Sequence, residues 1–304
     1  MDDVLIAAFR QAQQHEALAA TTDWPAVQLA TARVYAQYLA IGEAGRPIRM
    51  RAGRLGFFLA DLIDRPNPTK GKISRTLSAR NPWDWIDDPH PFWIDCADRN
   101  VHFSDGRTMA FGKPTQIDRC GERLALGSCY SPGGYLIDEA GNCEFLDRPL
   151  PIVLAATHPA LGRIEVMQNG YINLENGLHI GTMNCARVWR ARLVDDNIYA
   201  SDWSEVGTLF RFSLKDRKVD RIACAPVMIC NDVVAHFDGF ALLDKFQGHV
   251  FFFDANWRYL RAVMAFGNAP GRLFDPISLK SNETGDLKVV NWINGEMTEW
   301  HHDQ

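Results

Sequence analysis

Four polar residues in one short stretch have the types that proton transfer and carboxylate binding require. They are Arg75, His90, Asp95 and Asp98. An arginine can hold a carboxylate through two parallel hydrogen bonds, and a histidine titrates near neutral pH. An aspartate can act as a base or fix the tautomer of a histidine. Each residue can equally be an ordinary loop charge or turn former, so the stretch predicts a catalytic site without naming a reaction.

The segment that carries Arg75 and His90, residues 65–91, holds five prolines together with large aromatic rings. Repeated prolines break regular structure, whereas flexible linkers are usually poor in aromatics. We therefore predict an ordered loop on a surface or beside a pocket. The aromatic rings near the four polar residues suit a flat aromatic substrate, and they are Trp83, Trp85, Phe92, Trp93 and Phe103.

A second set of polar residues stands near the ends of apolar runs further along the chain: Asn184, Asn231, Asp232, His236, Asn291 and His301. Oxygen ligands such as these hold calcium in some β proteins, but Asn and Asp are also the usual turn formers. We assign Asn184 to substrate binding and assign no residue to a metal. The sequence has no nucleophile elbow, phosphate-binding loop, dinucleotide fingerprint or H-E-x-x-H motif.

The elements that must position these residues are strands, because one pattern occurs three times between Asn197 and the end of the chain. Each copy is an apolar strand, a short polar break and a second strand. Ile198, Phe240 and Leu287 stand at matching places, 42 and then 47 residues apart. A repeat of about 40–50 residues with several strands is typical of a β-propeller blade.

We predict a mainly β protein with three segments. Residues 1–64 have apolar residues at helical spacing and form an N-terminal helical segment. Residues 65–91 are the ordered loop, and residues 92–304 form a β-propeller-like domain. Dividing that domain by about 42–45 residues per blade gives about five blades, and a six-bladed ring with one thin blade is the neighbouring possibility.

Composition excludes several classes of protein. The net charge of −5 argues against a general nucleic-acid binder. No apolar run reaches the roughly 18–20 residues of a membrane helix, and the acidic start has the wrong charge order for a secretion signal. Seven cysteines without a CxxC pair fit reduced thiols in a cytoplasmic protein.

The stretch from Arg75 to His90 resembles the bacterial β-carboline-forming Pictet–Spenglerases. The layout is similar, with a helical part, a polar loop and propeller-like blades. The family has an arginine followed by a histidine in this loop, and Arg75 and His90 have the matching spacing. The family also has a glutamate about ten residues after the histidine, where this chain has Asn100, with Asp98 and Asp95 nearby.

This resemblance implies a homodimeric enzyme of alkaloid biosynthesis that condenses tryptophan, or a related arylethylamine, with an aldehyde and needs no cofactor. Arg75 would hold the substrate carboxylate, while Trp83, Trp85 and Trp93 would form the aromatic slot. His90, with Asp98 or Asp95, would move protons. Two alternatives remain open: a calcium-dependent propeller lactonase or esterase, and a propeller that binds a small molecule or a protein without catalysis.

Overall fold

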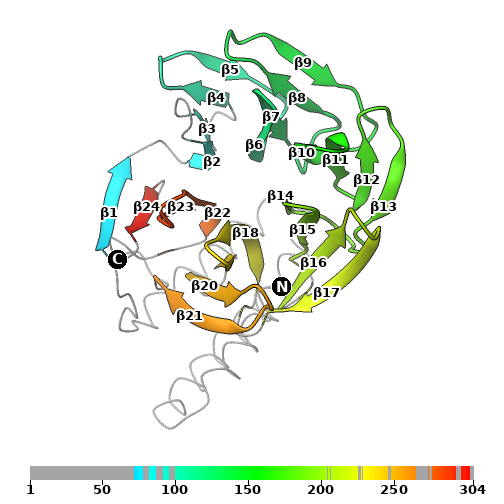
Figure 1. Ribbon diagram of the computed structural model, residues 1–304. Coiled ribbons are helices and arrows are strands. Elements are labelled where there is room, and N and C mark those ends of the chain that lie inside the picture. The colour runs from blue at the N-terminus through cyan, green and yellow to red at the C-terminus, as the bar shows by residue number, and fades with distance from the viewer. Residues whose placement is uncertain are drawn as a thin grey trace, which may run out of the picture.

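The described part of the chain is built from strands alone. A computed structural model describes residues 72–301 apart from 78–81, 87–91, 96–99, 204, 206, 225–226, 228, 246–247, 265–272, 274–275 and 292–295. Within these ranges the chain forms six antiparallel four-stranded sheets arranged as blades around an axis (Figure 1). The protein is therefore a six-bladed β-propeller. The predicted helical segment 1–64 lies outside the described residues.

Five blades are continuous in sequence, and in each the first strand lies innermost. Blade 1 is β2 (Pro82–Ile86), β3 (Phe92–Asp95), β4 (Asn100–Phe103) and β5 (Thr108–Ala110). Blade 2 is β6 (Gln116–Cys120), β7 (Arg123–Gly127), β8 (Gly134–Ile137) and β9 (Cys143–Leu146). Blade 3 is β10 (Ile152–His158), β11 (Gly162–Met167), β12 (Tyr171–Leu174) and β13 (His179–Thr182). Blade 4 is β14 (Arg190–Val194), β15 (Asn197–Ser201), β16 (Thr208–Ser213) and β17 (Lys218–Ala223). Blade 5 is β18 (Cys230–His236), β19 (Gly239–Asp244), β20 (His249–Asp254) and β21 (Tyr259–Val263).

Blade 6 closes the ring with strands from both ends of the propeller. It contains β22 (Pro276–Ser281), β23 (Leu287–Asn291) and β24 (Glu296–His301), and its outermost strand is β1 (Lys72–Leu77). β1 pairs antiparallel with β24, so Ile73 lies opposite Trp300 (Figure 1). This pairing removes the seam that a ring of separate sheets would have.

Two sequence predictions are corrected by this arrangement. The blade count is six rather than five, because residues 72–301 divided among six blades give about 38 residues per blade, fewer than the 42–45 assumed. Residues 65–91 were predicted to be a loop, yet Lys72–Leu77 and Pro82–Ile86 are strands of blades 6 and 1. Pro82 is tolerated there because it is the first residue of its strand.

The repeat that indicated blades is confirmed. Ile198, Phe240 and Leu287 lie in β15, β19 and β23, which are the second strands of blades 4, 5 and 6. The chain turns at Asn169-Gly170 between β11 and β12, where Gly170 has a φ of 85°. A glycine adopts this conformation without the steric cost that a side chain would add.

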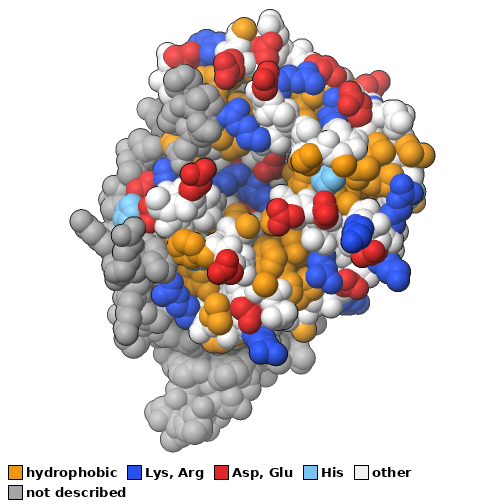
Figure 2. All heavy atoms as spheres, viewed as in Figure 1, with side chains coloured by type: hydrophobic (Ala, Val, Ile, Leu, Met, Phe, Trp, Pro, Cys, Tyr) orange, Lys and Arg blue, Asp and Glu red, His pale blue; other side chains and the backbone are white. Residues whose placement is uncertain are grey.

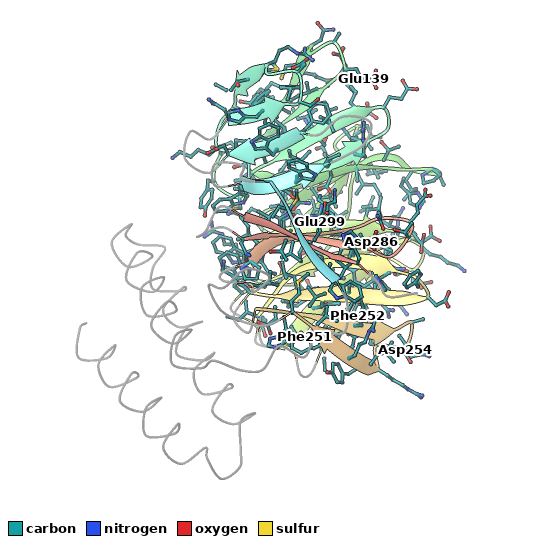
Figure 3. The ribbon with its side chains drawn as sticks, turned by 90° about the vertical axis from the view of Figure 1, so that its left-hand side faces the viewer. Glu139, Phe251, Phe252, Asp254, Asp286 and Glu299 are labelled. Carbon is teal, nitrogen blue, oxygen red and sulfur yellow. The ribbon has the colours of Figure 1, made fainter. Side chains whose placement is uncertain are left out.

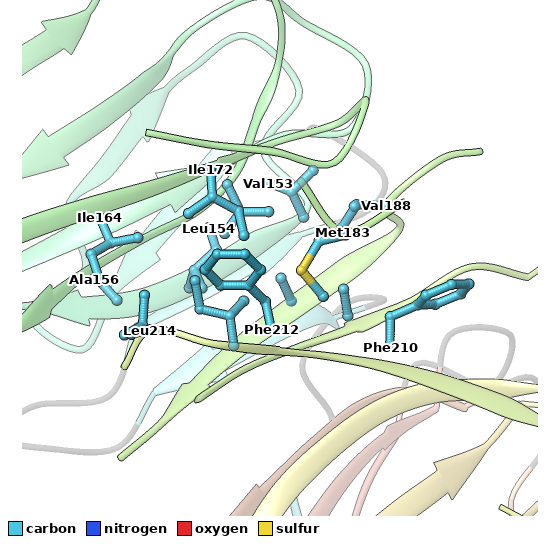
Figure 4. Packing of buried hydrophobic residues seen from close by; sticks show 14 of the residues in the cluster. Val153, Leu154, Ala156, Ile164, Ile172, Met183, Val188, Phe210, Phe212 and Leu214 are labelled. Atoms are coloured by element: carbon cyan, nitrogen blue, oxygen red, sulfur yellow. The ribbon is translucent and has the colours of Figure 1, made fainter. Parts of the chain in front are cut away.

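The core lies between neighbouring blades, where apolar side chains of facing sheets pack together. Between blades 3 and 4 it includes Leu154, Ile164, Ile172 and Phe212 (Figure 4). Phe212 approaches Gly181 of β13 so closely that a Cβ there would lie 2.3 Å from its ring. Glycine at position 181 therefore allows the Phe212 side chain of blade 4 to pack against the sheet of blade 3.

Candidate functional site

Polar residues face the axis from the innermost strands of five blades. Three of these strands carry them two residues apart, so that both side chains of each pair point the same way. The pairs are Gln116 and Asp118 on β6, Arg190 and Arg192 on β14, and Ser278 and Lys280 on β22. Blades 1 and 5 add Asp84 and Asp232, each just after a register shift in its strand. Figure 2 shows charged side chains of both signs deep in the hollow at the middle of the ring.

Asp84 is the acceptor that ties the most chain segments together. Its Oδ2 accepts hydrogen bonds from Arg190 Nη1 at 2.9 Å and from the Ile117 backbone N–H at 2.9 Å. Its Oδ1 accepts from the Trp85 N–H at 2.8 Å and from the Ser278 hydroxyl. The side chain is wholly buried. Because blades 1 and 4 are three blades apart in a six-membered ring, the Asp84–Arg190 pair crosses the axis.

Arg192 makes the second cross-connection. Its Nε and Nη2 donate to the two carboxylate oxygens of Asp232 at 2.9 and 2.8 Å, and its Nη1 donates to Asp118. Asp232 Oδ2 also accepts from the Leu279 N–H at 3.0 Å. Blades 2, 4, 5 and 6 are therefore joined through one guanidinium and one carboxylate.

The charges of this axial network fix its protonation. Burial alone would raise the pKa of Asp84, but the cations Arg190, Lys280 and Arg192, with the Ser278 hydroxyl, lower its pKa well below the usual range. Burial opposes the charge of Arg192 too, yet Asp118 and Asp232 raise its pKa well above the usual value. Both groups stay ionised at neutral pH. The network is thus a plug of paired charges, since each buried charge has an opposite charge in contact.

A cavity of about 370 Å³ lies between blades 1 and 2, away from the axis. Residues from β3, β4, β6, β7 and β8 and from three turns line it: Phe92, Phe103, Ser104, Asp105, Arg107, Arg119, Glu122, Leu124, Ile137, Asp138 and Glu139. Phe92 and Phe103 form an edge-to-face pair with centroids 5.1 Å apart. Figure 3 places Glu139 at the rim of the ring, well away from Asp286 and Glu299 of blade 6.

Half of the charged residues of the cavity wall already have partners among the described residues. Arg107 Nε contacts Asp105 Oδ2 at 2.6 Å, and its guanidinium lies 4.9 Å from the centre of the Phe103 ring. Asp138 accepts from the backbone and side-chain nitrogens of Asn142 at 2.7 and 2.8 Å, which lowers its pKa. Arg119 differs, because its Nη2 is buried and has no hydrogen-bond partner among the described residues. A buried donor left unsatisfied costs about 1–3 kcal/mol, and more when it is charged.

The structure separates the residues that the sequence grouped as one site. Trp83 and Trp85 are buried in the core with Ile94 and Ile117, so they line no open slot. Trp93 stacks between Trp85 and His102, at centroid distances of 5.8 and 5.4 Å.

The three polar candidates that the structure describes lie on different parts of the ring. Asp95, at the end of β3, is only 4% exposed. Arg75 lies in β1 opposite Thr298, on the outer strand of blade 6. Asn184 is an exposed loop residue between blades 3 and 4 with a φ of 52°. His90 and Asp98 lie outside the described residues.

The residues proposed as oxygen ligands for calcium have other partners. Asn231 donates its amide to the backbone oxygens of Pro276 and Ile277 at 3.3 and 2.7 Å. Both carboxylate oxygens of Asp232 are bound by Arg192. Across the ranges that the structure describes, no group of three His, Cys, Asp or Glu residues is placed to hold a metal ion.

Sequence reasoning missed both the axial network and the cavity. The network had a signal, since Gln-x-Asp, Arg-x-Arg and Ser-x-Lys occur at strand spacing inside otherwise apolar runs. The cavity had a partial signal, because two of its lining residues, Phe92 and Phe103, were among the aromatic residues that the sequence placed near the polar candidates. Arg119 had no signal, because nothing in the sequence distinguishes it from an ordinary exposed strand residue.

Comparison with known proteins supports the fold and goes no further. No protein-family model matches the chain, and no curated protein matches its sequence. Similar solved structures include virginiamycin B lyase from Staphylococcus aureus, with a TM-score of 0.54 and 10% identity over 76% of this chain and 89% of that one. The WD40 β-propeller domain of Doa1 has a TM-score of 0.54 and 13% identity over 77% and 98% of the two chains.

A third similar structure is an auxiliary nutrient binding protein from Bacteroides ovatus, with a TM-score of 0.56 and 11% identity over 74% and 70% of the two chains. At these identities the likeness concerns the propeller fold alone, which serves a lyase, a WD40 domain and a nutrient-binding protein. No helix in the described residues is long and apolar enough to cross a membrane.

Proposed function

We propose that this propeller binds a small zwitterion with a flat ring, of the aromatic amino acid class, in the cavity between blades 1 and 2. The observation that carries the proposal is the buried Arg119 Nη2 without a partner at the wall of a cavity of about 370 Å³. This volume falls in the range of small-molecule sites. A ligand carboxylate would supply the acceptor that the guanidinium lacks.

The rest of the wall suits the other parts of such a ligand. Glu122 and Glu139 are exposed acidic residues of two turns at the cavity, and they can attract an ammonium group. Phe92 and Leu124 offer apolar surface to a ring. Arg119 thus takes the carboxylate-binding role that the sequence assigned to Arg75.

The reaction proposed for the bound amine is the one that the resemblance implies, a Pictet–Spengler cyclisation. The amine would condense with an aldehyde and lose water, the ring would attack the resulting iminium carbon, and a base would then remove the ring proton. We assign the role of that base to Glu122 or Glu139, the two exposed glutamates in turns at the cavity. Binding and cyclisation are separable parts of the proposal, because binding does not require the aldehyde.

Titration calorimetry of the full chain with tryptophan tests the binding. Tryptamine, which lacks the carboxylate, and indole-3-propionate, which lacks the ammonium group, serve as matched ligands. Arg119→Met should weaken tryptophan binding about 10- to 100-fold, the effect of one charge-assisted contact, and leave tryptamine binding unchanged. Arg123→Met is the control variant, since Arg123 is on the next strand and pairs with Glu144.

Tryptophan binding that survives Arg119→Met unchanged would overturn this site. Cyclisation is tested separately by mass spectrometry of tryptophan incubated with a small aldehyde and the protein. The expected product has the summed mass of both substrates less one water. Binding without turnover would leave a binding propeller, and activity abolished by a chelator would favour the calcium-dependent hydrolase instead.

A further inference from the structure

Among the described residues, Lys280 makes no side-chain hydrogen bond to another member of the axial network. Its Nζ donates one hydrogen bond, to the Ile117 carbonyl oxygen at 3.1 Å. It lies 3.6 Å from Asp84 Oδ1 and 4.0 Å from Asp118 Oδ1, beyond hydrogen-bond distance of either. Both carboxylates are already bound by arginines, Asp84 by Arg190 and Asp118 by Arg192. A neutral amine can keep the bond to the carbonyl oxygen and still present its lone pair.

The lysine is also the most accessible charged group of the network. Its side chain is 21% exposed and that of Asp118 16%, while Asp84 and Asp232 are wholly covered. Along β22, exposure rises from the buried Ser278 to Lys280, toward the carboxyl end of the strand. The basic side chains visible at the bottom of the central hollow in Figure 2 agree with access from this side.

Burial is the main factor that favours the neutral amine. Burial lowers the pKa of Lys280, and the Arg192 guanidinium lowers it further, while Asp84, Asp118 and Asp232 act in the opposite direction without reversing the shift. A lysine that is desolvated beside another cation is the arrangement that produces nucleophilic amines in proteins.

We propose that Lys280 is a carbonyl-reactive amine, which forms an imine with a small aldehyde or ketone that enters the hollow along the propeller axis. The nitrogen lone pair attacks the carbonyl carbon and gives a carbinolamine. The carbinolamine then loses its hydroxyl group, which leaves as water with the protons that the nitrogen gives up, and a C=N bond forms. No oxidant or reductant takes part. This site is separate from the cavity between blades 1 and 2, and it does not depend on the ligand proposed there.

Reductive trapping tests the proposal on the unmodified full chain. The native protein is incubated with propanal at limiting concentration and with cyanoborohydride, which reduces an imine to a stable secondary amine. Peptide mass spectrometry then gives the labelling rate of each lysine. Lys215 and Lys218, both exposed near the turn between β16 and β17, are internal references. At pH 7 Lys280 should be labelled at least 10-fold faster than either, and its rate should level off at a lower pH than theirs.

Two variants complete the test. Lys280→Arg keeps a cation at the axis and should remove the fast label while the far-ultraviolet circular dichroism stays that of the native fold. Lys288→Arg is the matched control on the neighbouring strand, where Lys288 pairs with Glu299 at 3.0 Å, and it should leave the fast label in place. Equal labelling of Lys280, Lys215 and Lys218, or a fast label that persists in Lys280→Arg, would overturn the proposal. Loss of the fast label on prior unfolding in urea is expected, because the effect comes from the folded environment.

Discussion

Replacing Asp84 with asparagine should destabilise the propeller more than any other change of a single charge at the axis. The substitution keeps the shape of the side chain and removes its charge. Asparagine also places an NH₂ group where one carboxylate oxygen stood, so two donors then face each other. Arg190 Nη1, 2.9 Å from Asp84 Oδ2, would keep its charge in a site where it is only 6% exposed.

The magnitude follows from that burial. Removing one partner of a buried ion pair costs about 3–5 kcal/mol when the remaining charge loses its compensation, and Arg190 would keep only the Asp232 carboxylate at 3.5 Å. Folded domains have a total stability of about 5–15 kcal/mol, so Asp84→Asn should remove a large fraction of it. Exposed ion pairs contribute only about 0–1 kcal/mol. Asp220→Asn provides that comparison, since Arg211 and Asp220 form a pair at 2.6 Å with side chains 36% and 51% exposed.

Urea unfolding followed by tryptophan fluorescence measures both variants. Asp84→Asn should shift the midpoint strongly without changing the slope, and Asp220→Asn should shift it little. Arg190→Met in the Asp84→Asn background should recover part of the loss, because the buried cation that lost its closer partner is gone. The double-mutant cycle should give a coupling energy above about 1 kcal/mol. Equal midpoints for Asp84→Asn and Asp220→Asn would refute the account of the axial network as a structural plug.

Three further predictions concern acid stability, packing and assembly. The pKa of Asp84 is lower in the folded state than in the unfolded state. Its contribution to stability is therefore complete above the unfolded pKa of about 4 and is lost as pH falls through the folded value. Unfolding midpoints measured from pH 6 downward should fall less steeply below about pH 4 in Asp84→Asn than in the wild type. Gly127→Ala would place a Cβ 2.1 Å from the Val153 carbonyl oxygen of the next blade, so it should lower the free energy of unfolding by about 1–3 kcal/mol or more in urea. Gly162 has a φ of 73° and open space around it, so Gly162→Ala should lower that free energy by about 1–2 kcal/mol from backbone strain alone. Light scattering should give a dimer mass for the full chain and a monomer mass for a chain that begins at residue 65; equal monomer masses would contradict assembly through the N-terminal segment.

The strand pattern predicted the propeller, but not where the ring begins and ends. Local alternation and turn residues identify strands such as those at Ile198 and Phe240, because these signals extend over a few residues. The pairing of β1 with β24 joins Lys72 to His301, and no local pattern encodes a contact over that separation. β2 was missed for a different reason, since its first residue is a proline in a proline-rich segment and proline counts against a strand.

The candidate site residues were grouped by proximity in sequence, and the described ones among them do not all lie together in space. Trp83 and Trp85 sit near Arg75 and His90 in the chain, yet they pack in the core between blades, where large aromatics contribute most to stability. Arg75 belongs to a different blade from these tryptophans. Phe92 and Phe103 were grouped correctly with each other, because they are neighbours across β3 and β4, and short-range strand pairing keeps such residues together.

The charge plug determines where chemistry can occur on this ring. Ion pairs join blades 1, 2, 4 and 5 across the axis, so a ligand must approach from one face rather than pass through. Exposure within the network increases toward the carboxyl ends of the innermost strands, at Asp118 and Lys280. The turns after those ends, such as Glu122 between β6 and β7, also line the cavity between blades 1 and 2. The amine at the axis and the unpaired guanidinium at Arg119 therefore belong to the same face of the propeller.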